Sequence, residues 1–355
     1  DLVGLLQSCS ETRVGALRRV YDEPITHPVN GIYGNEASIC DHIAGLFCMS
    51  FISCAFKALF ALGPRAFVFL LLRFGAMRRI ARRTPRPNRV HSMHAGWCGL
   101  AAWVIASRYG VPFSFSCHAH DVFVQKRLLR FLLKRADNAI TCNSKAHAEV
   151  QGSAPEGCAV HFIAHPVPSD GTASTGEGEY LFAAARAVPK KDLPGLLKAF
   201  EMIHSAHPSV QLPIAGASER HIGEAQQGVN PLGFVAPHRM KELYGKARVF
   251  IHAGRTLPNG DSDGLPNVVL EAMVAGVPVV TTDAGAVRDI VQHRVTGLVV
   301  PEREPQALAT AVIELLENDG LRAKLAENGR ARARERHDPK ECAQKLAVVL
   351  CPSDI

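Results

Sequence analysis

The sequence predicts an α/β protein of two domains, each with a parallel sheet and helices on both faces of that sheet. Short apolar runs alternate with amphipathic segments from residue 88 onward, which is typical of strand–helix repeats. The chain has 355 residues, 47% hydrophobic and 21% charged, which is enough for two ordinary globular cores. Residues 166–178 are rich in Pro, Gly, Ser and Thr and predict a linker. We therefore expect domains over residues 1–167 and 168–335, and a helix over 336–355 that packs back toward the first domain.

The first domain begins without a clear signal. Residues 1–40 show no strand followed by a Gly-rich turn, and a chain that starts at Asp1 is consistent with a cut N-terminus. Residues 43–72 are apolar, but Lys57, Gly63 and Arg65 interrupt them, so two helices joined at Gly63 are expected and no run is long enough to cross a bilayer. Further along, the patterns predict strands at 90–94, 112–117, 139–142 and 160–163, and helices at 99–109 and 126–136.

The second domain repeats this alternation more regularly. Strands are predicted at 180–184, 210–214, 229–234, 249–252, 277–282 and 298–301, and helices at 193–204, 239–247 and 266–276 and again from residue 301 to the end. In parallel sheets of this kind, ligands bind beyond the carboxyl ends of the strands. Two such domains that face each other are expected to hold a ligand in the cleft between them.

The charge is divided unequally between the two halves. Residues 1–167 hold 19 Lys and Arg against 10 Asp and Glu, whereas the remainder holds 21 against 23. Seven arginines without an acid among them follow the apolar helices: Arg73, Arg78, Arg79, Arg82, Arg83, Arg86 and Arg89. Such a segment is typical of a peripheral contact with an anionic membrane face, or of a helical hairpin with solvated arginines, and both interpretations stay open. No nucleic-acid partner is expected.

Ten cysteines are present, and none forms a CxxC pair or a metal-like spacing with histidine. Scattered cysteines of this kind indicate buried thiols in a reducing compartment, so a cytoplasmic protein is expected, located at most at the inner face of a membrane.

The strongest functional pattern lies at residues 263–276. A tight loop leads through Pro266 into an apolar segment that ends at Gly276, and Pro and Gly in these places favour the start and the end of a helix. The amides and the dipole at a helix start attract anions. One turn in, Glu271 stands among apolar residues, where two sugar hydroxyls would satisfy its carboxylate. Phosphate at the helix start and a diol one turn further describe a nucleotide, bound by Gly264, Leu265, Asn267, Val268 and Glu271.

Basic side chains follow the strand at 180–184. Arg186 and Lys191 precede a helix, so a diphosphate is the expected ligand, although a solvated basic loop is the alternative for this pair alone. Asp263 is an acid beside a phosphate site and therefore is expected to face sugar hydroxyls or the positive charge that develops at an anomeric carbon, with a helix cap as the alternative. A base is expected against the turn at Phe234 and Val235.

In the first domain, His118, His120 and Asp121 follow an apolar strand, where the cleft should be. A histidine there can donate to a hydroxyl or to a departing phosphate. No third well-spaced group supports a metal, and no metal or other cofactor is expected. The sequence contains no P-loop, no GxSxG and no HExxH pattern.

Taken together, these residues resemble the retaining glycosyltransferases of family 4, which have the GT-B fold of two facing Rossmann-like domains. The resemblance runs from about residue 90 to the end and rests on four segments: residues 263–273, 186–191, 118–121 and 296–301, with Gly285. The His-Ala-His-Asp form of residues 118–121 is similar to enzymes of bacterial exopolysaccharide and colanic-acid-type synthesis.

The resemblance implies a role for each matching residue. Glu271 would hold the ribose of a nucleotide-sugar donor, and Arg186 and Lys191 would hold its diphosphate. Asp263, where the family more usually has Glu, would face the donor sugar, and His118 would act from the opposite domain. It also implies metal-independent transfer that retains the anomeric configuration and uses the departing phosphate as base. The acceptor would be a saccharide or a lipid-linked molecule.

The sequence departs from the family pattern at two places in the diphosphate loop, where Ala185 and Asp192 stand for the usual glycines. We expect weaker diphosphate binding or a shifted loop there. A nucleotide-sugar epimerase on the same fold and a non-catalytic nucleotide-sugar binder are the alternative functions. An epimerase would need acid–base groups on both faces of the sugar, and the sequence shows one cluster, at His118.

Overall fold

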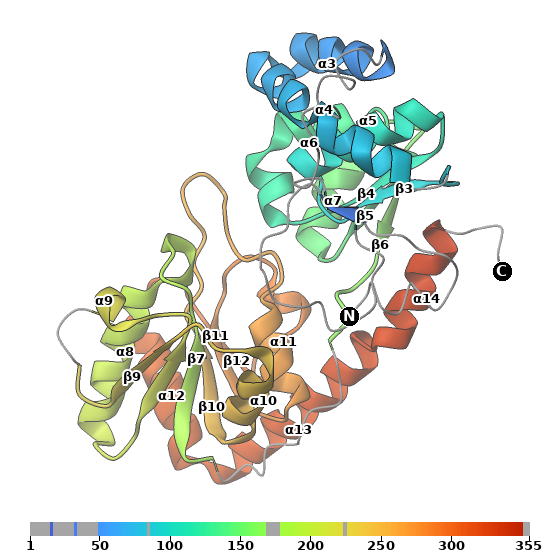
Figure 1. Cartoon of the computed structure of the whole chain (residues 1–355). Helices are drawn as coiled ribbons and strands as arrows, with labels where there is room; N and C mark the ends of the chain where they lie inside the picture. Colours follow the sequence, from blue (N-terminus) through green and yellow to red (C-terminus); the bar gives the residue numbers. More distant parts are fainter. Residues whose placement is uncertain are drawn as a thin grey trace. The chain divides into compact units, whose positions relative to one another are not determined.

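The computed structural model describes residues 15–16, 32–33, 49–83, 86–167, 178–222 and 226–350. These form two compact units (Figure 1). The N-terminal unit contains the described residues up to Cys142 together with Ala146–Ile163 and the segment from Lys340 onward. The C-terminal unit contains Asn143–Lys145 and Ala164–Pro339. Most of the predicted linker, and most of the unpatterned residues 1–40, lie outside the described residues.

The N-terminal unit is built on a four-stranded parallel sheet. Its order is β3 (Val90–Ser92), β4 (Phe113–Cys117), β5 (Asn138–Thr141) and β6 (Ala159–Phe162). Helices α5 (Trp97–Tyr109), α6 (Lys126–Leu133) and α7 (Ser144–Ser153) connect these strands. Two short strands, β1 (Gly15–Ala16) and β2 (Ile32–Tyr33), pair with each other in parallel. The predicted strands and helices here are confirmed, although α6 ends at Leu133 rather than at residue 136 and α7 was not predicted.

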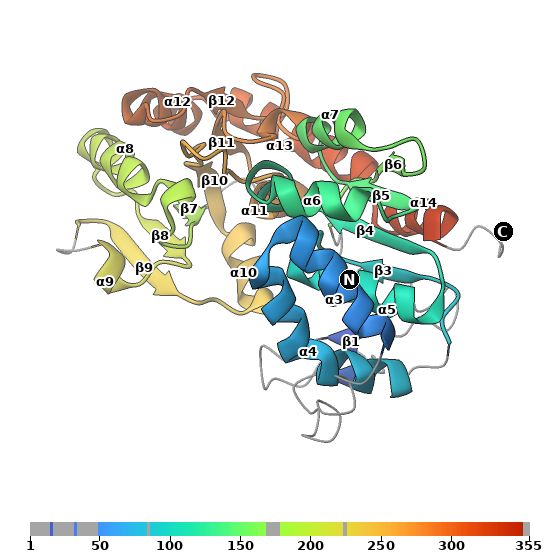
Figure 2. The same ribbon diagram turned by 90° about the horizontal axis from the view of Figure 1, so that it is seen from above.

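Two further helices, α3 (Met49–Leu62) and α4 (Pro64–Arg83), form the predicted pair joined at Gly63. Gly63 has a φ of +94°, a conformation that glycine adopts without strain and that turns the chain between the helices. The two helices lie side by side (Figures 1 and 2). Phe51 and Phe74 meet between them with ring centroids 5.4 Å apart, inside a core shared with α5 and α6. We call this element the α3–α4 hairpin.

The C-terminal unit is a six-stranded parallel sheet in the order β12-β11-β10-β7-β8-β9. The strands are β7 (Tyr180–Ala184), β8 (Leu212–Ala215), β9 (Val229–Gly233), β10 (Ala247–His252), β11 (Val279–Thr282) and β12 (Leu298–Val300). The chain builds outward from β7 to β9 and then resumes on the other side of β7 with β10. Neighbouring loops after β7 and β10 therefore diverge at this point, which is where doubly wound sheets bind ligands.

Side chains alternate across this sheet. Leu181 and Val249 face a core formed with α8 (Leu193–Ala206) and α12 (Pro305–Glu317), whereas Phe182 and Phe250 face a core formed with α10 (Pro237–Gly245) and α11 (Asn267–Val274). Figure 1 shows the two pairs of helices on the two faces of the sheet. The wholly apolar strands follow from this, because both of their faces are covered. The predicted fold class, α/β with two parallel sheets, is confirmed.

The described part of the chain ends with three helices. Besides α12 these are α13 (Asp319–Arg336) and α14 (Pro339–Leu350), and a short α9 (Glu219–Ile222) precedes β9. Leu346 of α14 is buried against Ile140 and Ile163 of the N-terminal unit, to which this helix belongs. Among the described residues, no helix is both long enough and apolar enough to cross a membrane.

Candidate functional site

The C-terminal unit places an acid and a lysine against each other at the point where its sheet changes direction. Lys191 ends a short 3₁₀ helix, Pro189–Lys191, after β7, and Asp263 lies on the loop after β10. The Nζ atom of Lys191 is 2.6 Å from Oδ2 of Asp263, and both side chains are largely buried. Beside them, Lys190 pairs with Asp261 at 3.1 Å, and the amide of Arg255 donates to the carbonyl of Lys190. The two loops are thus tied together along their length.

A histidine completes the surroundings of Asp263. The Nε2 atom of His252 lies 3.1 Å from the same Oδ2 atom that Lys191 contacts. Burial alone would raise the pKa of Asp263, but the bond to His252 and the charge of Lys191 outweigh it and hold that pKa well below the usual range. Asp263 is therefore an ionised carboxylate at neutral pH.

The loop that carries Asp263 is also held from a third side. Gly285 lies so close that a Cβ atom there would be 1.8 Å from the carbonyl oxygen of Asp263, and its φ is +60°. The amide of Ala286 donates to the carbonyl of Gly264 at 3.2 Å. Glycine at 285 is therefore needed for the backbones to approach.

Helix α11 follows this loop as predicted. Pro266 occupies the N-cap position, one residue earlier than the first helical position expected for it, and the first backbone bond runs from the amide of Val269 to the carbonyl of Pro266. The amides of Asn267 and Val268 precede that bond and lie at the positive end of the helix. Beyond the helix, Gly276 has a φ of +78° and ends it as expected.

Glu271 lies one turn into α11 and keeps a partly buried carboxylate. The hydroxyl of Tyr244 donates to its Oε2 atom at 2.8 Å. Burial raises the pKa of Glu271, and the bond from Tyr244 opposes that rise. The carboxylate is thus held in place by a tyrosine hydroxyl, which carries no positive charge. It can still accept hydrogen bonds from further hydroxyls.

The loop after β7 shows the effect of one of the two departures from the family pattern, the one at Asp192. Asp192 adopts a φ of +40°, a left-handed conformation in which glycine would be unstrained, and its carboxylate pairs with Arg255 at 3.4 Å. Arg186 is exposed, and no ion pair is seen for it among the described residues. The loop therefore keeps a conformation suited to glycine and offers the guanidinium of Arg186 to solvent.

The turn after β9 lies at a separate groove. Phe234 is 85% exposed, and with Val235 it lines a groove of about 720 Å³ that runs along the sheet toward Lys246. Glu271 and Lys191 do not line this groove. The predicted contact of a base with Phe234 and Val235 stays a prediction.

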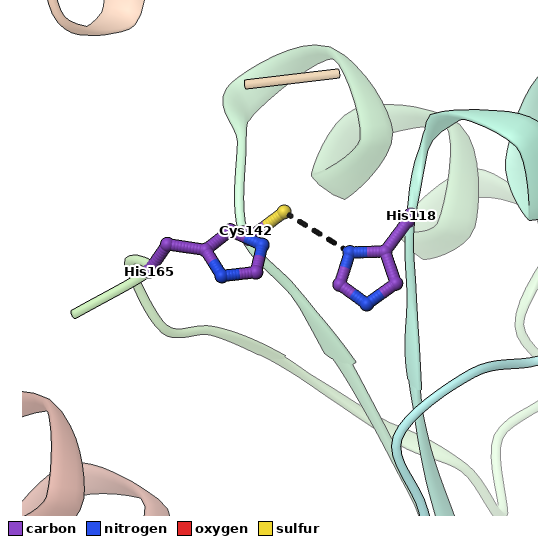
Figure 3. Close-up of side chains that lie close together, drawn as sticks. All are labelled: His118, Cys142 and His165. Carbon is purple, nitrogen blue, oxygen red and sulfur yellow. Dashed lines mark hydrogen bonds between the residues drawn. The ribbon is translucent and has the colours of Figure 1, made fainter. Parts of the chain in front are cut away.

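In the N-terminal unit, His118 directly follows β4. Its Nε2 atom lies 3.1 Å from the carbonyl of Met93, and its Nδ1 atom lies 3.9 Å from Sγ of Cys142 (Figure 3). Since a carbonyl only accepts, Nε2 carries the hydrogen and Nδ1 accepts from the thiol. Burial, followed by the neighbouring His94, lowers the pKa of His118, so the ring is neutral at pH 7.

The other two members of the predicted His-Ala-His-Asp cluster are separated in role. Asp121 is buried and accepts from the backbone amides of His118 at 3.1 Å and Ala95 at 3.4 Å, so that it fixes two loops. His120 is exposed and begins a π-helical turn, His120–Val124. Within this cluster, His118 is thus the member whose side chain remains a candidate for chemistry.

Sequence reasoning missed two site residues, Tyr244 and His252. Tyr244 lies on α10 and reaches Glu271 across the helix interface. His252 is the last residue of β10, and a polar residue at the carboxyl end of an apolar parallel strand was the signal available in the sequence.

Two family models match adjoining parts of this chain. Residues 51–170 match the model of the Glycosyltransferase Family 4 domain, and residues 170–332 match that of Glycosyl transferases group 1. The amylovoran biosynthesis glycosyltransferase AmsK of Erwinia amylovora is 24% identical over 48% of this chain and 44% of its own length. The phosphatidyl-myo-inositol mannosyltransferase of Mycobacterium tuberculosis is 32% identical over 55% of this chain and 52% of its own. The chain thus spans about half the length of these relatives.

Among solved structures, HepE of Anabaena in complex with UDP-glucose superposes with a TM-score of 0.66 at 17% identity, over 95% of this chain and 98% of that one. At this identity the likeness concerns the fold. The two matched domains together span nearly all of the described chain, and the sheet of the C-terminal unit has the strand order of a Rossmann-like domain. The chain therefore belongs to the family 4 and group 1 glycosyltransferases and has the GT-B fold.

Proposed function

We propose that this protein is a retaining, metal-independent glycosyltransferase that moves a sugar from a nucleoside-diphosphate-sugar donor to a saccharide or lipid-linked acceptor in polysaccharide or glycoconjugate synthesis. The observation that carries the proposal is Glu271, a partly buried carboxylate held by a neutral tyrosine one turn into α11. That helix directly follows the loop of the Lys191–Asp263 pair. The solved HepE complex with UDP-glucose and the role of AmsK in amylovoran biosynthesis support a nucleotide-sugar donor and a polysaccharide product.

Each residue then has a chemical task. Glu271 accepts from the two ribose hydroxyls, while Arg186, Lys191 and the first amides of α11 offset the diphosphate charge that a metal would otherwise offset. The acceptor oxygen forms a bond to the anomeric carbon on the face from which the diphosphate leaves. The bond between that carbon and the phosphate oxygen breaks, its electron pair stays on the phosphate, and the same phosphate takes the proton of the acceptor. The ionised Asp263 stabilises the positive charge at the anomeric carbon.

Donor turnover tests this proposal. Thermal-shift measurements with UDP, GDP, ADP and TDP first identify the nucleotide, because a ligand that binds only the folded protein raises its melting temperature. Release of free nucleoside diphosphate is then measured with and without saccharide acceptors. We expect Glu271→Ala to abolish release and the exposed Glu201→Ala on α8 to leave it unchanged.

The alternatives give different results in the same assay. An epimerase converts the donor sugar without releasing nucleoside diphosphate, and a non-catalytic binder shows the thermal shift without turnover. Turnover that survives Glu271→Ala would show that the donor site has been assigned to the wrong residues. For His118, which stays a candidate, His118→Ala should lower turnover without weakening the thermal shift given by the nucleoside diphosphate alone.

A membrane contact at the α3–α4 hairpin forms the second part of the proposal. Large apolar side chains lie exposed on it, with Phe60 83%, Met49 76% and Leu72 66% exposed. No Asp or Glu occurs between residues 42 and 120, whereas ten Lys and Arg do. An apolar surface within a wholly cationic segment is complementary to an anionic lipid surface, where a lipid-linked acceptor would be found.

Sedimentation with vesicles separates the contribution of the exposed apolar side chains from that of the arginines. Phe60→Ser with Leu72→Ser should reduce binding to vesicles of phosphatidylcholine and phosphatidylglycerol, whereas Val348→Ser, at an apolar position on α14 that is 55% exposed, should not. Arg73→Gln with Arg78→Gln should weaken the same binding by about 2 kcal/mol, or about 30-fold, at low salt. Binding that none of these changes affects would remove the hairpin as the membrane contact.

A further inference from the structure

The side chain of His252 is enclosed in the C-terminal unit, and both of its ring nitrogens have partners, one of which is the acid of the site. The residue is 3% exposed at the end of β10. Nε2 lies 3.1 Å from Oδ2 of Asp263, and Nδ1 lies 3.1 Å from the hydroxyl oxygen of Thr281. Thr281 is the register partner of His252 in β11, so two paired strands hold this contact. The ring therefore connects the centre of the sheet to the acid of the site.

The hydrogen on the ring can be assigned from its partners. The ionised carboxylate of Asp263 only accepts, so Nε2 carries the hydrogen and donates it. Burial lowers the pKa of His252 more than the bond to Asp263 raises it, and the charge of Lys191 lowers it further. The ring is therefore neutral, and Nδ1 can accept only if the hydroxyl of Thr281 donates to it at 3.1 Å rather than to the carbonyl of Thr282 at 3.2 Å.

The position of the ring is also fixed by packing. A Cβ atom added at Gly254 would lie 2.6 Å from Cε1 of His252 and 3.3 Å from Cβ of Ala284. Glycine at 254 thus leaves the space that the imidazole fills. The ring lies against one oxygen of Asp263 and against the backbone at Gly254.

Lys191 and His252 contact the same oxygen of Asp263, and this has a consequence when a donor binds. An incoming diphosphate competes with Asp263 for the charge of Lys191. If Lys191 turns to the phosphate, a cation leaves Oδ2 while the neutral N–H of His252 remains. A neutral donor keeps the carboxylate in place without cancelling the negative charge that the reacting sugar requires.

We propose that His252 is a positioning residue for Asp263: it holds Oδ2 through a neutral N–H when the donor diphosphate draws Lys191 away, and so leaves Oδ1 to face the donor sugar. This inference rests on the proposed function for the identity of the ligand, but the hydrogen-bond chain Thr281–His252–Asp263 is independent of it.

Kinetics with paired variants test the positioning role. The substrate is whichever of UDP-glucose, UDP-N-acetylglucosamine and GDP-mannose the wild type turns over. His252→Leu should lower kcat about 100-fold, as a misplaced catalytic group does, while the donor KM changes by less than about 3-fold. His252→Gln keeps an N–H donor and should recover at least about a tenth of the wild-type kcat. Equal loss in both variants, or a loss that lies in KM alone, would overturn the proposal.

The control is His91, a partly buried histidine of the N-terminal unit that also uses both ring nitrogens. Its Nδ1 and Nε2 atoms lie 3.0 and 3.1 Å from the hydroxyls of Ser114 and Ser116. His91→Leu removes a comparable pair of hydrogen bonds from another sheet and should leave kcat unchanged. A kcat that falls equally in His91→Leu would show that the effect at His252 is general destabilisation.

A spectroscopic measurement separates failure of this inference from failure of the proposed function. Long-range ¹H–¹⁵N spectra of the ¹⁵N-histidine-labelled protein report the ring tautomer, and the signal absent from His252→Gln identifies His252. We expect the neutral Nε2–H form from pH 6 to 8, with shifts that change in Asp263→Asn. A ring that carries its hydrogen on Nδ1, or that is protonated in this range, would contradict the inference even in an active enzyme. If the protein shows the neutral Nε2–H form of His252 but turns over no donor, the positioning of Asp263 by His252 stands and the proposed glycosyltransferase function is overturned.

Discussion

Replacement of Lys191 by methionine tests how strongly the two loops of the candidate site depend on one ion pair. The change keeps an unbranched side chain of similar length but removes one of the two side-chain contacts described for Asp263. The contact with His252 remains. The neighbouring Lys190→Met is a matched control, because Lys190 pairs with Asp261 on the same loops at 3.1 Å. The two pairs differ mainly in burial: 11% and 12% of the side-chain surface is exposed in the first, against 21% and 19% in the second.

The expected magnitudes follow from this difference. Removal of one partner from a fully buried pair costs about 3–5 kcal/mol, and an exposed pair contributes about 0–1 kcal/mol. Because the carboxylate of Asp263 keeps a hydrogen bond from His252, we expect Lys191→Met to lower the free energy of unfolding by about 1–3 kcal/mol and Lys190→Met by less than about 1 kcal/mol. For a unit of this size, each kcal/mol corresponds to about 2–4 °C in melting temperature.

The assay should be calorimetry or far-ultraviolet circular dichroism. Both tryptophans, Trp97 and Trp103, lie in the N-terminal unit, so their fluorescence does not report unfolding of the C-terminal one. The pKa of Asp263 is lowered in the folded state, so its stabilisation is present above the unfolded value of about 3.9 and is lost as the pH falls through the folded value. The difference between Lys191→Met and the wild type should therefore shrink below pH 4. Equal effects of the two substitutions at pH 7, or a difference that does not depend on pH, would refute the reasoning.

Three further predictions concern the same unit. Asp192→Gly and Asp192→Ala both remove the pair with Arg255, but only glycine relieves the φ of +40°, so calorimetry should find the glycine variant more stable by about 1 kcal/mol, and equal stabilities would argue against strain. Gly285→Ala places a Cβ 1.8 Å from the carbonyl of Asp263 and should destabilise the protein and abolish turnover, whereas Gly152→Ala, with no atom within 4 Å, should do neither. The pKa of Glu271 is raised by burial, so the protonated form is favoured in the folded state, a stabilisation present below the unfolded pKa and lost as the pH rises through the folded one. The melting temperature of Glu271→Gln minus that of the wild type should therefore be larger at pH 8 than at pH 4.5. The variant should also lose donor turnover. A difference in melting temperature that is the same at both pH values would contradict this prediction.

The strands of both sheets could be predicted from sequence because they are apolar runs between clear turns. Residues 180–184 and 249–252 were predicted within two residues of β7 and β10. Helix α7 was missed because its segment, from Ser144 to Ser153, has only a weak apolar stripe, with Ala146 and Val150 buried. Its helical state is decided by packing rather than by local pattern.

The site residues also divide into those that a local sequence pattern predicts and those that only tertiary contacts reveal. The residues of the loop and helix at 263–271 could be predicted because a polar group stood out within an apolar context. Tyr244 could not, because it acts on Glu271 across a helix interface. His252 stood out as a polar residue at the end of an apolar strand, but its contact with Asp263 depends on the path of the loop between them, which the sequence does not reveal. The structural role of Asp121 could not be predicted either. An aspartate that accepts hydrogen bonds from two backbone amides cannot be told from one that binds a ligand by sequence alone.

Helix α14 gives the chain an order of assembly. The N-terminal unit takes in residues up to Ile163 and then again from Lys340, while the C-terminal unit is contained between Ala164 and Pro339 apart from three residues. During synthesis, every residue of the C-terminal unit has been made before the N-terminal unit receives α14, whose Leu346 covers Ile140 and Ile163. A nascent chain stopped before residue 340 would leave those two side chains uncovered by α14, so completion of the N-terminal unit must wait for residues made after the whole of the C-terminal unit.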